Sequence, residues 1–259
     1  MKIGILLKQT PDTETKIKIK PDASGIEEAD IKWVISTYDE YAVEEALRLK
    51  EKVPGSEVVV LSAGPKRSVE AIRQAMAMGV DRGIHINTEG LALDSYLTSL
   101  VLAKAASTEG FDVLLGGKQA IDDDNVQVAF GVAQILGWPC VWPVEYLEAS
   151  ADGKTIVVHR PVAGGVKEIL EVGLPGVLCC DKGEHEPRYA SLPGIMKAKT
   201  KPLQEIAAKD FVGTATPLVS WSGFSLPPER KAGQILKGDD PGKLCDELIR
   251  LLREEAKVI

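Results

Sequence analysis

Hydrophobic and polar positions along the first 137 residues form segments that predict buried strands and amphipathic helices in turn. Short apolar runs between turn residues are typical of buried strands, and apolar positions spaced three and four apart are typical of helices. The pattern predicts strands at residues 2–7, 57–64, 82–86 and 112–117, and helices at residues 39–52, 68–79, 93–107 and 125–137. Strands that alternate with helices predict an α/β fold with a doubly wound, mostly parallel sheet covered by helices on both faces.

Capping residues support the ends of these helices. Asp39 is placed to cap the first helix, and Asp94 or Ser95 the third, because short polar side chains accept hydrogen bonds from the first free N–H groups. Gly79 and Gly137 follow the second and fourth helices, where glycine readily adopts the conformation that ends a helix.

The pattern changes after residues 138–143. Residues 155–172 predict an antiparallel hairpin and residues 174–180 a further buried strand, but no regular strand is expected beyond Pro187. Proline-rich, irregular sequence then runs to a final helix at residues 241–256. A long segment without apolar periodicity cannot bury itself, so we expect an irregular C-terminal arm that wraps around another chain.

Composition excludes several classes of protein. Hydrophobic residues make up 44% and charged residues 27% of the 259 positions, which is ordinary for a globular protein. The net charge of −7, the absence of a basic block and the aromatic content of 5% argue against nucleic-acid binding. No apolar run reaches the roughly 18 residues that cross a bilayer, so a membrane protein is not expected.

The positions of cysteine and histidine indicate the cellular compartment and whether a metal site is expected. The sequence opens directly on a short strand without a signal-peptide pattern, and its four cysteines show no CxxC spacing. Adjacent Cys179 and Cys180 cannot form an ordinary disulfide. We therefore expect four buried thiols, Cys140, Cys179, Cys180 and Cys245, in a reducing cytoplasm. The three histidines stand far apart in the sequence, and no metal site is expected.

Small and polar residues follow three of the predicted strands. They are Lys8 and Gln9, then Ser62 to Gly64, then Gly116 to Gln119. The carboxyl ends of parallel strands meet at one edge of a sheet, where such folds bind ligands, so these residues could surround a nucleotide. Neither GxGxxG nor GxxxxGK[ST] occurs, nor the Ser-Gly-Gly loop of ATP pyrophosphatases or the HxGH of nucleotidyltransferases. A bound nucleotide would not be cleaved.

Three consecutive aspartates, Asp122 to Asp124, stand before the fourth helix and have three interpretations. Asp124 could cap that helix, since acidic residues complement its positive end. A carboxylate could accept from ribose hydroxyls, as in dinucleotide-binding folds. The third interpretation is a Mg²⁺ site, although companion ligands are missing elsewhere. The aspartates would repel a phosphate, so its donors would be the backbone N–H groups of Asn125 to Val128.

Five segments together resemble the β subunit of electron-transfer flavoprotein, over nearly the whole chain. They are residues 42–52, 75–86, 117–128, 174–177 and 186–203, and the most specific is the last, EPRYASLPGIMKAKTKPL. The resemblance implies a Rossmann-like, adenine-nucleotide-binding domain at residues 1–185. Residues 186–259 would be the end of a recognition loop and an arm that packs on the α subunit.

The same resemblance implies an electron carrier rather than an enzyme, with no catalytic residue in β. The heterodimer carries one FAD, held mostly by α, and passes electrons from flavin dehydrogenases to a quinone oxidoreductase. The β subunit of the common class buries a structural AMP. The cofactor-binding residues implied here are Leu6, Leu7, Lys8, Ser36, Thr37, Tyr38, Asp39, Ser62, Ala63, Gly64, Gln119, Ile121, Asp122, Asp124, Asn125, Val126, Gln127 and Val128. Tyr38 would approach the dimethylbenzene edge of the flavin, or serve only as a core aromatic.

Departures from the family pattern indicate which nucleotide the β subunit would bind. The family often has Asn-Pro at Ser36 and Thr37, and a Thr at Val126 or Val128, so phosphate contacts here would come from the backbone. An electron-bifurcating class binds a second FAD in β and carries a glycine where Asp123 stands. The Asp123 side chain hinders the close backbone approach that glycine permits, which favours AMP. A stand-alone adenine-nucleotide sensor or hydrolase, monomeric and active on ATP through Mg²⁺, remains the alternative from another class.

The resemblance also implies a partner-recognition loop at Glu184, His185, Glu186, Pro187, Arg188 and Tyr189. A Leu of this loop plugs an apolar pocket on acyl-CoA dehydrogenases in the family, and Glu184 stands at that position. An unpaired carboxylate is strongly disfavoured in an apolar pocket. The loop would therefore meet a basic surface on another dehydrogenase, or use a displaced anchor, or be an ordinary solvated loop.

Overall fold

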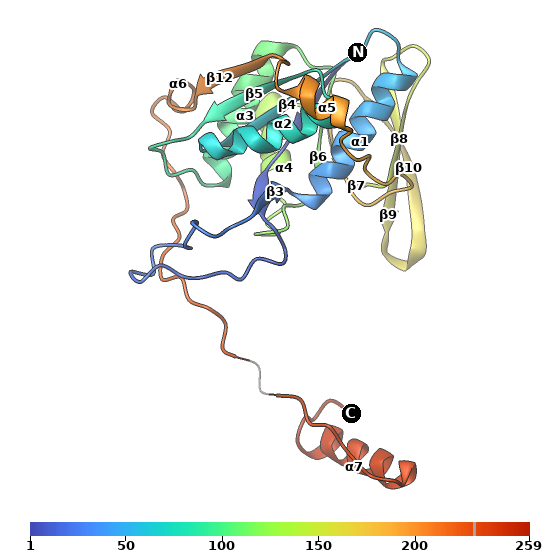
Figure 1. The fold of residues 1–259 in the computed structure, drawn as a ribbon. Helices are drawn as coiled ribbons and strands as arrows, with labels where there is room; N and C mark the ends of the chain where they lie inside the picture. The colour runs from blue at the N-terminus through green and yellow to red at the C-terminus, as the bar shows by residue number, and fades with distance from the viewer. Residues whose placement is uncertain (230–231) are drawn as a thin grey trace. The chain divides into compact units, whose positions relative to one another are not determined.

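The computed structural model describes residues 1–229 and 232–259 of the chain. Their contacts divide into two compact units, Met1–Gly223 and Phe224–Ile259 (Figure 1). The described part of the second unit contains one helix, α7 (Pro241–Glu254), which lies within the predicted final helix.

A seven-stranded sheet forms the centre of the first unit. Its strands, in spatial order, are β12 (Leu203–Ala207), β5 (Arg82–Asn87), β4 (Glu57–Gly64), β1 (Lys2–Leu6), β6 (Val113–Gly117), β11 (Gly176–Cys180) and β7 (Cys140–Val144). Every neighbouring pair is parallel. The chain moves outward from β1 through β4 and β5 and then returns to the other side of β1 at β6. The carboxyl ends of β1 and β6 therefore form the switch point at which such sheets bind ligands.

Helices cover both faces of this sheet, as the alternating pattern predicted (Figure 1). One face packs against α1 (Thr37–Lys52), α2 (Val69–Met78) and α5 (Leu192–Ala198). The other packs against α3 (Ser95–Glu109), α4 (Val128–Leu136) and α6 (Lys209–Val212). Two short 3₁₀ turns, η1 (Lys66–Ser68) and η2 (Ala163–Gly165), complete the helical elements described. The fold class is confirmed.

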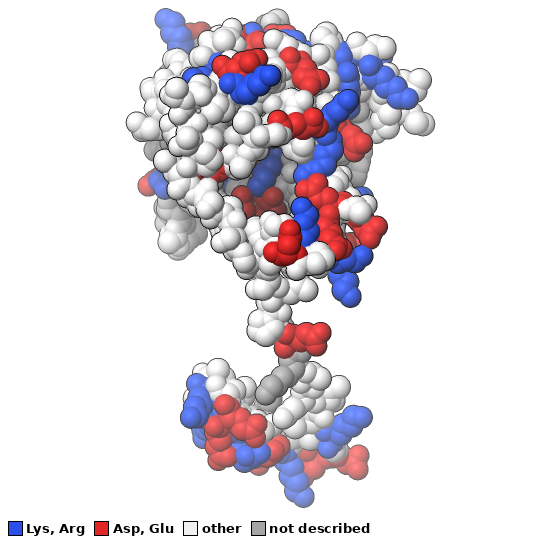
Figure 2. Space-filling model, turned by 90° about the vertical axis from the view of Figure 1, so that its left-hand side faces the viewer, with Lys and Arg blue, Asp and Glu red and all other residues white. Residues whose placement is uncertain are grey.

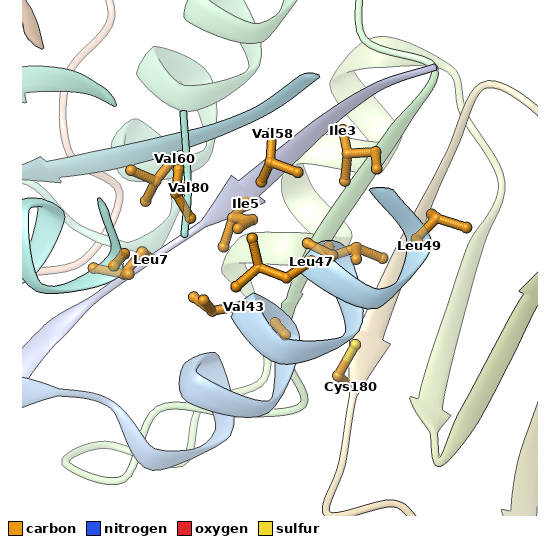
Figure 3. Packing of buried hydrophobic residues seen from close by; sticks show 14 of the residues in the cluster. Ile3, Ile5, Leu7, Val43, Leu47, Leu49, Val58, Val60, Val80 and Cys180 are labelled. Atoms are coloured by element: carbon orange, nitrogen blue, oxygen red, sulfur yellow. The ribbon is translucent and has the colours of Figure 1, made fainter. Parts of the chain in front are cut away.

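Alternation along β1 separates the two hydrophobic cores. Ile3, Ile5 and Leu7 pack in the cluster that includes residues of α1 and α2 (Figure 3). Leu6 packs in the cluster on the α3 side. Successive side chains of a strand point to opposite faces, so a strand covered on both faces is apolar throughout. Each fully buried Ile or Val contributes about 1.5–3 kcal/mol relative to an exposed one.

Two smaller sheets flank the main one. The strands β8 (Tyr146–Ala149), β9 (Thr155–Val162) and β10 (Val166–Gly173) form an antiparallel sheet that contains the predicted hairpin. Ile156 and Val158 of this sheet pack in the α1-side core. A two-stranded ribbon pairs β2 (Gln9–Pro11) with β3 (Trp33–Ile35), which the sequence pattern did not predict.

The prediction that regular strands end before Pro187 was wrong. Strand β12 lies beyond it and pairs with β5, and α5 packs on α2, so the first unit continues to Gly223. Strand β12 has only five residues at the edge of the sheet, with two of them exposed, and shows no alternation that marks a strand. Its backbone forms a strand because the β5 edge offers unpaired N–H and C=O groups.

Helix starts were partly mispredicted. Asp94 caps α3 by accepting the Leu97 N–H at 2.8 Å, as expected, and Gly137 ends α4 with a φ of 69°. Helix α1 instead begins after Ser36 and α4 after Gln127, and neither residue makes a side-chain capping bond. Asp39 and Asp124 are therefore not helix caps, and their carboxylates have other partners.

The described surface carries mixed charge. Figure 2 shows Lys and Arg side chains interspersed with Asp and Glu side chains on one face. Among the helices that the structure describes, none combines the length and the hydropathy needed to cross a membrane.

Candidate functional site

A cavity of about 330 Å³ lies at the switch point of the sheet. Its walls come from the ends of β1 and β6, the loop at residues 118–127, the N-terminal parts of α3 and α4, and Trp221. Ten residues predicted to bind a cofactor line it: Leu6, Leu7, Lys8, Asp39, Ala63, Gln119, Asn125, Val126, Gln127 and Val128. The cavity lies at the carboxyl edge where the strand ends predicted a ligand site, and that it binds a ligand stays a prediction.

Eight residues of the predicted set lie outside the lining: Ser36, Thr37, Tyr38, Ser62, Gly64, Ile121, Asp122 and Asp124. The hydroxyls of Ser36 and Ser62 are buried without a hydrogen-bond partner among the described residues. Conversely, the sequence missed eight residues that reach the cavity from the region of α3, from α4 and from the end of the unit: Leu93, Asp94, Ser95, Thr98, Leu102, Ala129, Phe130 and Trp221. Nothing in the chemistry of their local sequence marks them as cavity residues, because they reach the cavity only through the packing of α3 beside α4 and, for Trp221, through the attachment of residues 218 and 219 to Asp94.

Asp39 joins three elements beneath the cavity. Its carboxylate accepts the backbone N–H of Lys8 at 2.7 Å and that of Gly117 at 2.8 Å, although it belongs to the first turn of α1. A Cβ on Gly117 would come within 2.5 Å of Asp39 Oδ1, so the close approach of helix and strand requires glycine. Burial raises the pKa of Asp39 to about 7, against the opposing effect of the two N–H donors and Lys8.

Lys8 forms ion pairs with two of the three consecutive aspartates. Its Nζ donates to Asp122 Oδ1 at 2.7 Å and to Asp123 Oδ2 at 3.0 Å, which joins the end of β1 to the loop after β6. Burial disfavours the charge on Lys8, yet the two carboxylates raise its pKa above the usual value. Asp122 and Asp123 therefore hold the Lys8 ammonium at the edge of the cavity.

The loop between β6 and α4 has an unusual backbone. Asp124 and Val126 have φ angles of 50° and 55°, in the left-handed region where a β-branched residue such as valine is rare. Asp124 accepts from Gln119 Nε2 at 2.6 Å, and the Asn125 N–H donates to Asp123 Oδ1 at 3.2 Å. Strained backbone of this kind concentrates at ligand sites, where surrounding contacts hold it in place.

Free N–H groups at the cavity come from the start of α4. The Asn125 N–H is already engaged, and the helix begins only at Val128. The first N–H groups of a helix have no acceptor within it, and the helix dipole favours an anion beside them. Of the predicted donors, Val128 belongs to this first turn, so an anion bound here would meet N–H groups that include its own.

Tyr38 lies beside this site without lining it. The Nζ of Lys118 sits 4.7 Å from the centre of the Tyr38 ring and pairs with Asp181 at 3.0 Å. A cation over an aromatic face is attracted by the ring quadrupole. The Tyr38 ring therefore has a partner within the chain.

The predicted recognition segment is attached to α1. Arg188 binds Glu44 through its guanidinium and its backbone N–H, and His185 Nδ1 lies 2.8 Å from Glu45 Oε1. The Tyr41 hydroxyl donates to Glu186 Oε2 at 3.1 Å. Of the predicted residues, Glu184 is exposed and the Tyr189 side chain is 99% exposed, so these two are free to meet another molecule.

The prediction that all four cysteine thiols are buried is only partly confirmed. Cys179 and Cys180 are buried, Cys140 is half-buried with its Sγ 4.0 Å from that of Cys179, and Cys245 is exposed on α7. Within the residues that the structure describes, no three His, Cys, Asp or Glu side chains are grouped as a metal ion would require.

The fold and this site define an α/β protein with a cavity at the switch point of a parallel sheet. The model of the electron transfer flavoprotein domain matches residues 24–211. The chain belongs to the electron transfer flavoprotein family. It is 40% identical to the electron transfer flavoprotein subunit beta of Bacillus subtilis over 264 residues, with 100% of both chains covered.

Other relatives are equally complete. The human electron transfer flavoprotein subunit beta is 39% identical, with 100% of this chain and 99% of the human one covered. The mitochondrial subunit beta of Arabidopsis thaliana is 38% identical over 100% of both chains. The family resemblance inferred from the sequence is confirmed, and the full-length relatives are β subunits.

Proposed function

We propose that this chain acts as the β subunit of a heterodimeric electron transfer flavoprotein and holds AMP in the switch-point cavity. The α subunit is its partner and holds most of one FAD. Electrons pass from flavin dehydrogenases through that FAD to a respiratory quinone oxidoreductase. The chain itself contributes binding and assembly rather than acid–base catalysis, and the cytoplasm is its proposed compartment.

The observation that supports AMP most directly is the lining of the cavity. Its volume lies at the lower end of the range of about 300–1,000 Å³ typical of small-molecule sites. The first turn of α4 offers N–H donors for a phosphate, and Asn125 and Gln119 offer polar contacts for a ribose. The Asp123 side chain occupies the lining and binds Lys8, which leaves less room for a second flavin than a glycine would.

Co-purification tests this proposal. Co-expressed with its α subunit, the chain should yield a yellow heterodimer that releases about one AMP on denaturation, whereas the chain alone should be colourless. AMP at 100 times its Kd should raise the free energy of unfolding by about 2.7 kcal/mol, because it binds only the folded state. Release of two FAD per heterodimer would identify the bifurcating class. ATP hydrolysis by the chain alone would favour a sensor or hydrolase instead.

We also propose that Glu184 meets a basic surface on the electron donor. Asp181 is paired with Lys118, and Glu186 with Lys182 and Tyr41. Glu184 is exposed and has no ion-pair partner in the part of the chain that the structure describes. It is therefore the carboxylate of this segment that remains available to a partner.

Electron transfer from the physiological dehydrogenase should accordingly slow as salt is added and slow further in Glu184→Lys, since salt screens exposed charges and charge reversal repels a basic partner. Stopped-flow flavin reduction at several ionic strengths measures both effects. Glu89→Lys changes the charge equally at another exposed site and should leave the rate unchanged. A rate independent of salt, or a gain of acyl-CoA dehydrogenase coupling in Glu184→Leu, would point to an apolar anchor.

Tyr38 remains proposed as the aromatic neighbour of the flavin. Its half-buried ring already contacts Lys118 Nζ, so the two side chains together would present an aromatic edge and a positive charge toward the α subunit.

A further inference from the structure

Residues 214–222, here called the strap, follow α6 at the end of the first unit and are tied to the start of α3. The Oδ2 atom of Asp94 accepts the backbone N–H of Leu218 at 2.7 Å and that of Val219 at 3.1 Å. The Oδ1 atom of the same carboxylate caps α3 through the Leu97 N–H. Asp94 is only 8% exposed, so one buried carboxylate holds the helix start and the strap together.

This attachment brings a large aromatic ring to the cavity. Trp221 lies two residues beyond Val219 and is part of the cavity lining, while 70% of its surface is exposed. The side chains of Leu218 and Val219 are 74% and 56% exposed and do not reach the cavity. Of these three strap residues, only the tryptophan is placed to contact a ligand.

The cavity lining combines polar and apolar side chains. Polar residues come from the strand ends and the loop after β6, from α1 and from the start of α3: Lys8, Lys118, Gln119, Asp123, Asn125, Asp39, Asp94, Ser95 and Thr98. The larger apolar side chains from the region of α3, α4 and the strap are Leu93, Leu102, Val128, Phe130 and Trp221. A ligand with a charged, hydroxylated part and a flat, weakly polar part suits such a mixed lining.

We propose that Trp221 stacks on the base of the bound nucleotide, and that Asp94 positions it by pinning the strap. The inference rests on the proposed function, in which the cavity holds an adenine nucleotide. Stacking would cover an aromatic face that water otherwise meets, and an aromatic ring has a π-face suited to a purine. The base would then be recognised by Trp221, while the sugar and phosphate depend on the loop and α4.

Two ligands that differ only in the base, AMP and ribose 5-phosphate, test whether Trp221 contacts the base and not the sugar or the phosphate. The full-length chain is freed of nucleotide by dialysis, and calorimetry measures the Kd of AMP and of ribose 5-phosphate. Trp221→Ala should weaken AMP binding by about ten-fold or more, the range expected for loss of one base–aromatic stack. Trp221→Phe should retain part of the affinity. Ribose 5-phosphate, which lacks the base, should bind every variant equally.

Leu218→Ala is the matched control, because it removes an exposed apolar side chain from the same strap without touching the cavity or the backbone bonds to Asp94. Its AMP affinity should equal that of the wild type. Tryptophan fluorescence gives a second measurement: AMP should quench the emission of the wild type and quench Trp221→Phe much less.

The outcomes separate the two proposals. Unchanged AMP affinity in Trp221→Ala would overturn the stacking role and leave the nucleotide site standing. Equal weakening of AMP and ribose 5-phosphate would also overturn it, because the strap would then act on the whole cavity. If the wild type bound neither ligand, the proposed nucleotide site would fail, and the role of Trp221 with it.

Discussion

The free energy of unfolding of the first unit should fall as the pH rises from about 4 to about 7, and Asp39→Asn should remove most of that fall. Burial raises the pKa of Asp39 from 3.8 to about 7 in the folded chain. Between these two pH values the folded state keeps a proton on Asp39 that the unfolded state releases. The stabilisation that results is fully present below the pKa of the unfolded state, and it declines as the pH rises to the pKa of the folded state. At 1.36 kcal/mol per pKa unit the total decline is about 4 kcal/mol.

The measurement is guanidinium unfolding at pH 5 and at pH 8 for both proteins. The pH dependence is the readout, because the Lys8 and Gly117 N–H groups donate to different oxygens of Asp39, and asparagine replaces one of these acceptors with an NH2 donor, which changes stability at every pH. Asp30→Asn is the control for the loss of one negative charge, since the side chain of Asp30 is 81% exposed. Parallel curves for the wild type and Asp39→Asn would show that Asp39 is ionised throughout.

Arg188→Ala should lower the free energy of unfolding by about 3 kcal/mol at neutral pH, near the lower end of the range for a broken buried ion pair. Arg188 Nε and Nη2 donate to the Glu44 carboxylate at 2.7 and 3.0 Å, and the Glu44 side chain is only 2% exposed. Arg48 also binds Glu44, at 2.7 Å, and limits the loss. Burial disfavours the Glu44 charge, but its arginine partners lower its pKa below the usual value.

The sign of the pH effect follows from that lowered pKa. The ion pair stabilises the fold above the pKa that Glu44 has when unfolded, and this stabilisation is lost as the pH falls through the folded value. The difference between the wild type and Arg188→Ala should therefore shrink in acid.

Two further variants make the Arg188 test specific. Lys18→Ala breaks a pair in which both side chains are more than half exposed and should cost less than about 1 kcal/mol. The double variant Glu44→Leu/Arg188→Met should recover part of the loss, because it leaves no buried carboxylate unpaired. If Arg188→Ala cost no more than Lys18→Ala, the segment would not be anchored by this pair.

Local sequence was sufficient for the main elements of the fold. Apolar runs marked β1, β4, β5 and β6, since a strand buried on both faces must be apolar along its length. It was insufficient for β7 and β12. Strand β7 contains Pro143, and β12 exposes Gln204 and Glu205, so both resemble loops until the edges of the sheet are present to pair with them.

The sequence by itself determined the family and the alternation of strands and helices, and it predicted a ligand site at the edge of the sheet where the cavity lies. These follow from short-range periodicity, from the parallel topology that alternation imposes, and from an unusual string of residues around Arg188. Only the tertiary structure decided what the individual polar side chains do. Asp39 accepts hydrogen bonds from two strand ends instead of capping its helix, and Lys8 pairs with two aspartates. Asp94 accepts hydrogen bonds from a segment more than 120 residues away. A side chain settles where its buried hydrogen bonds can be satisfied, and those partners are set by packing between elements distant in sequence.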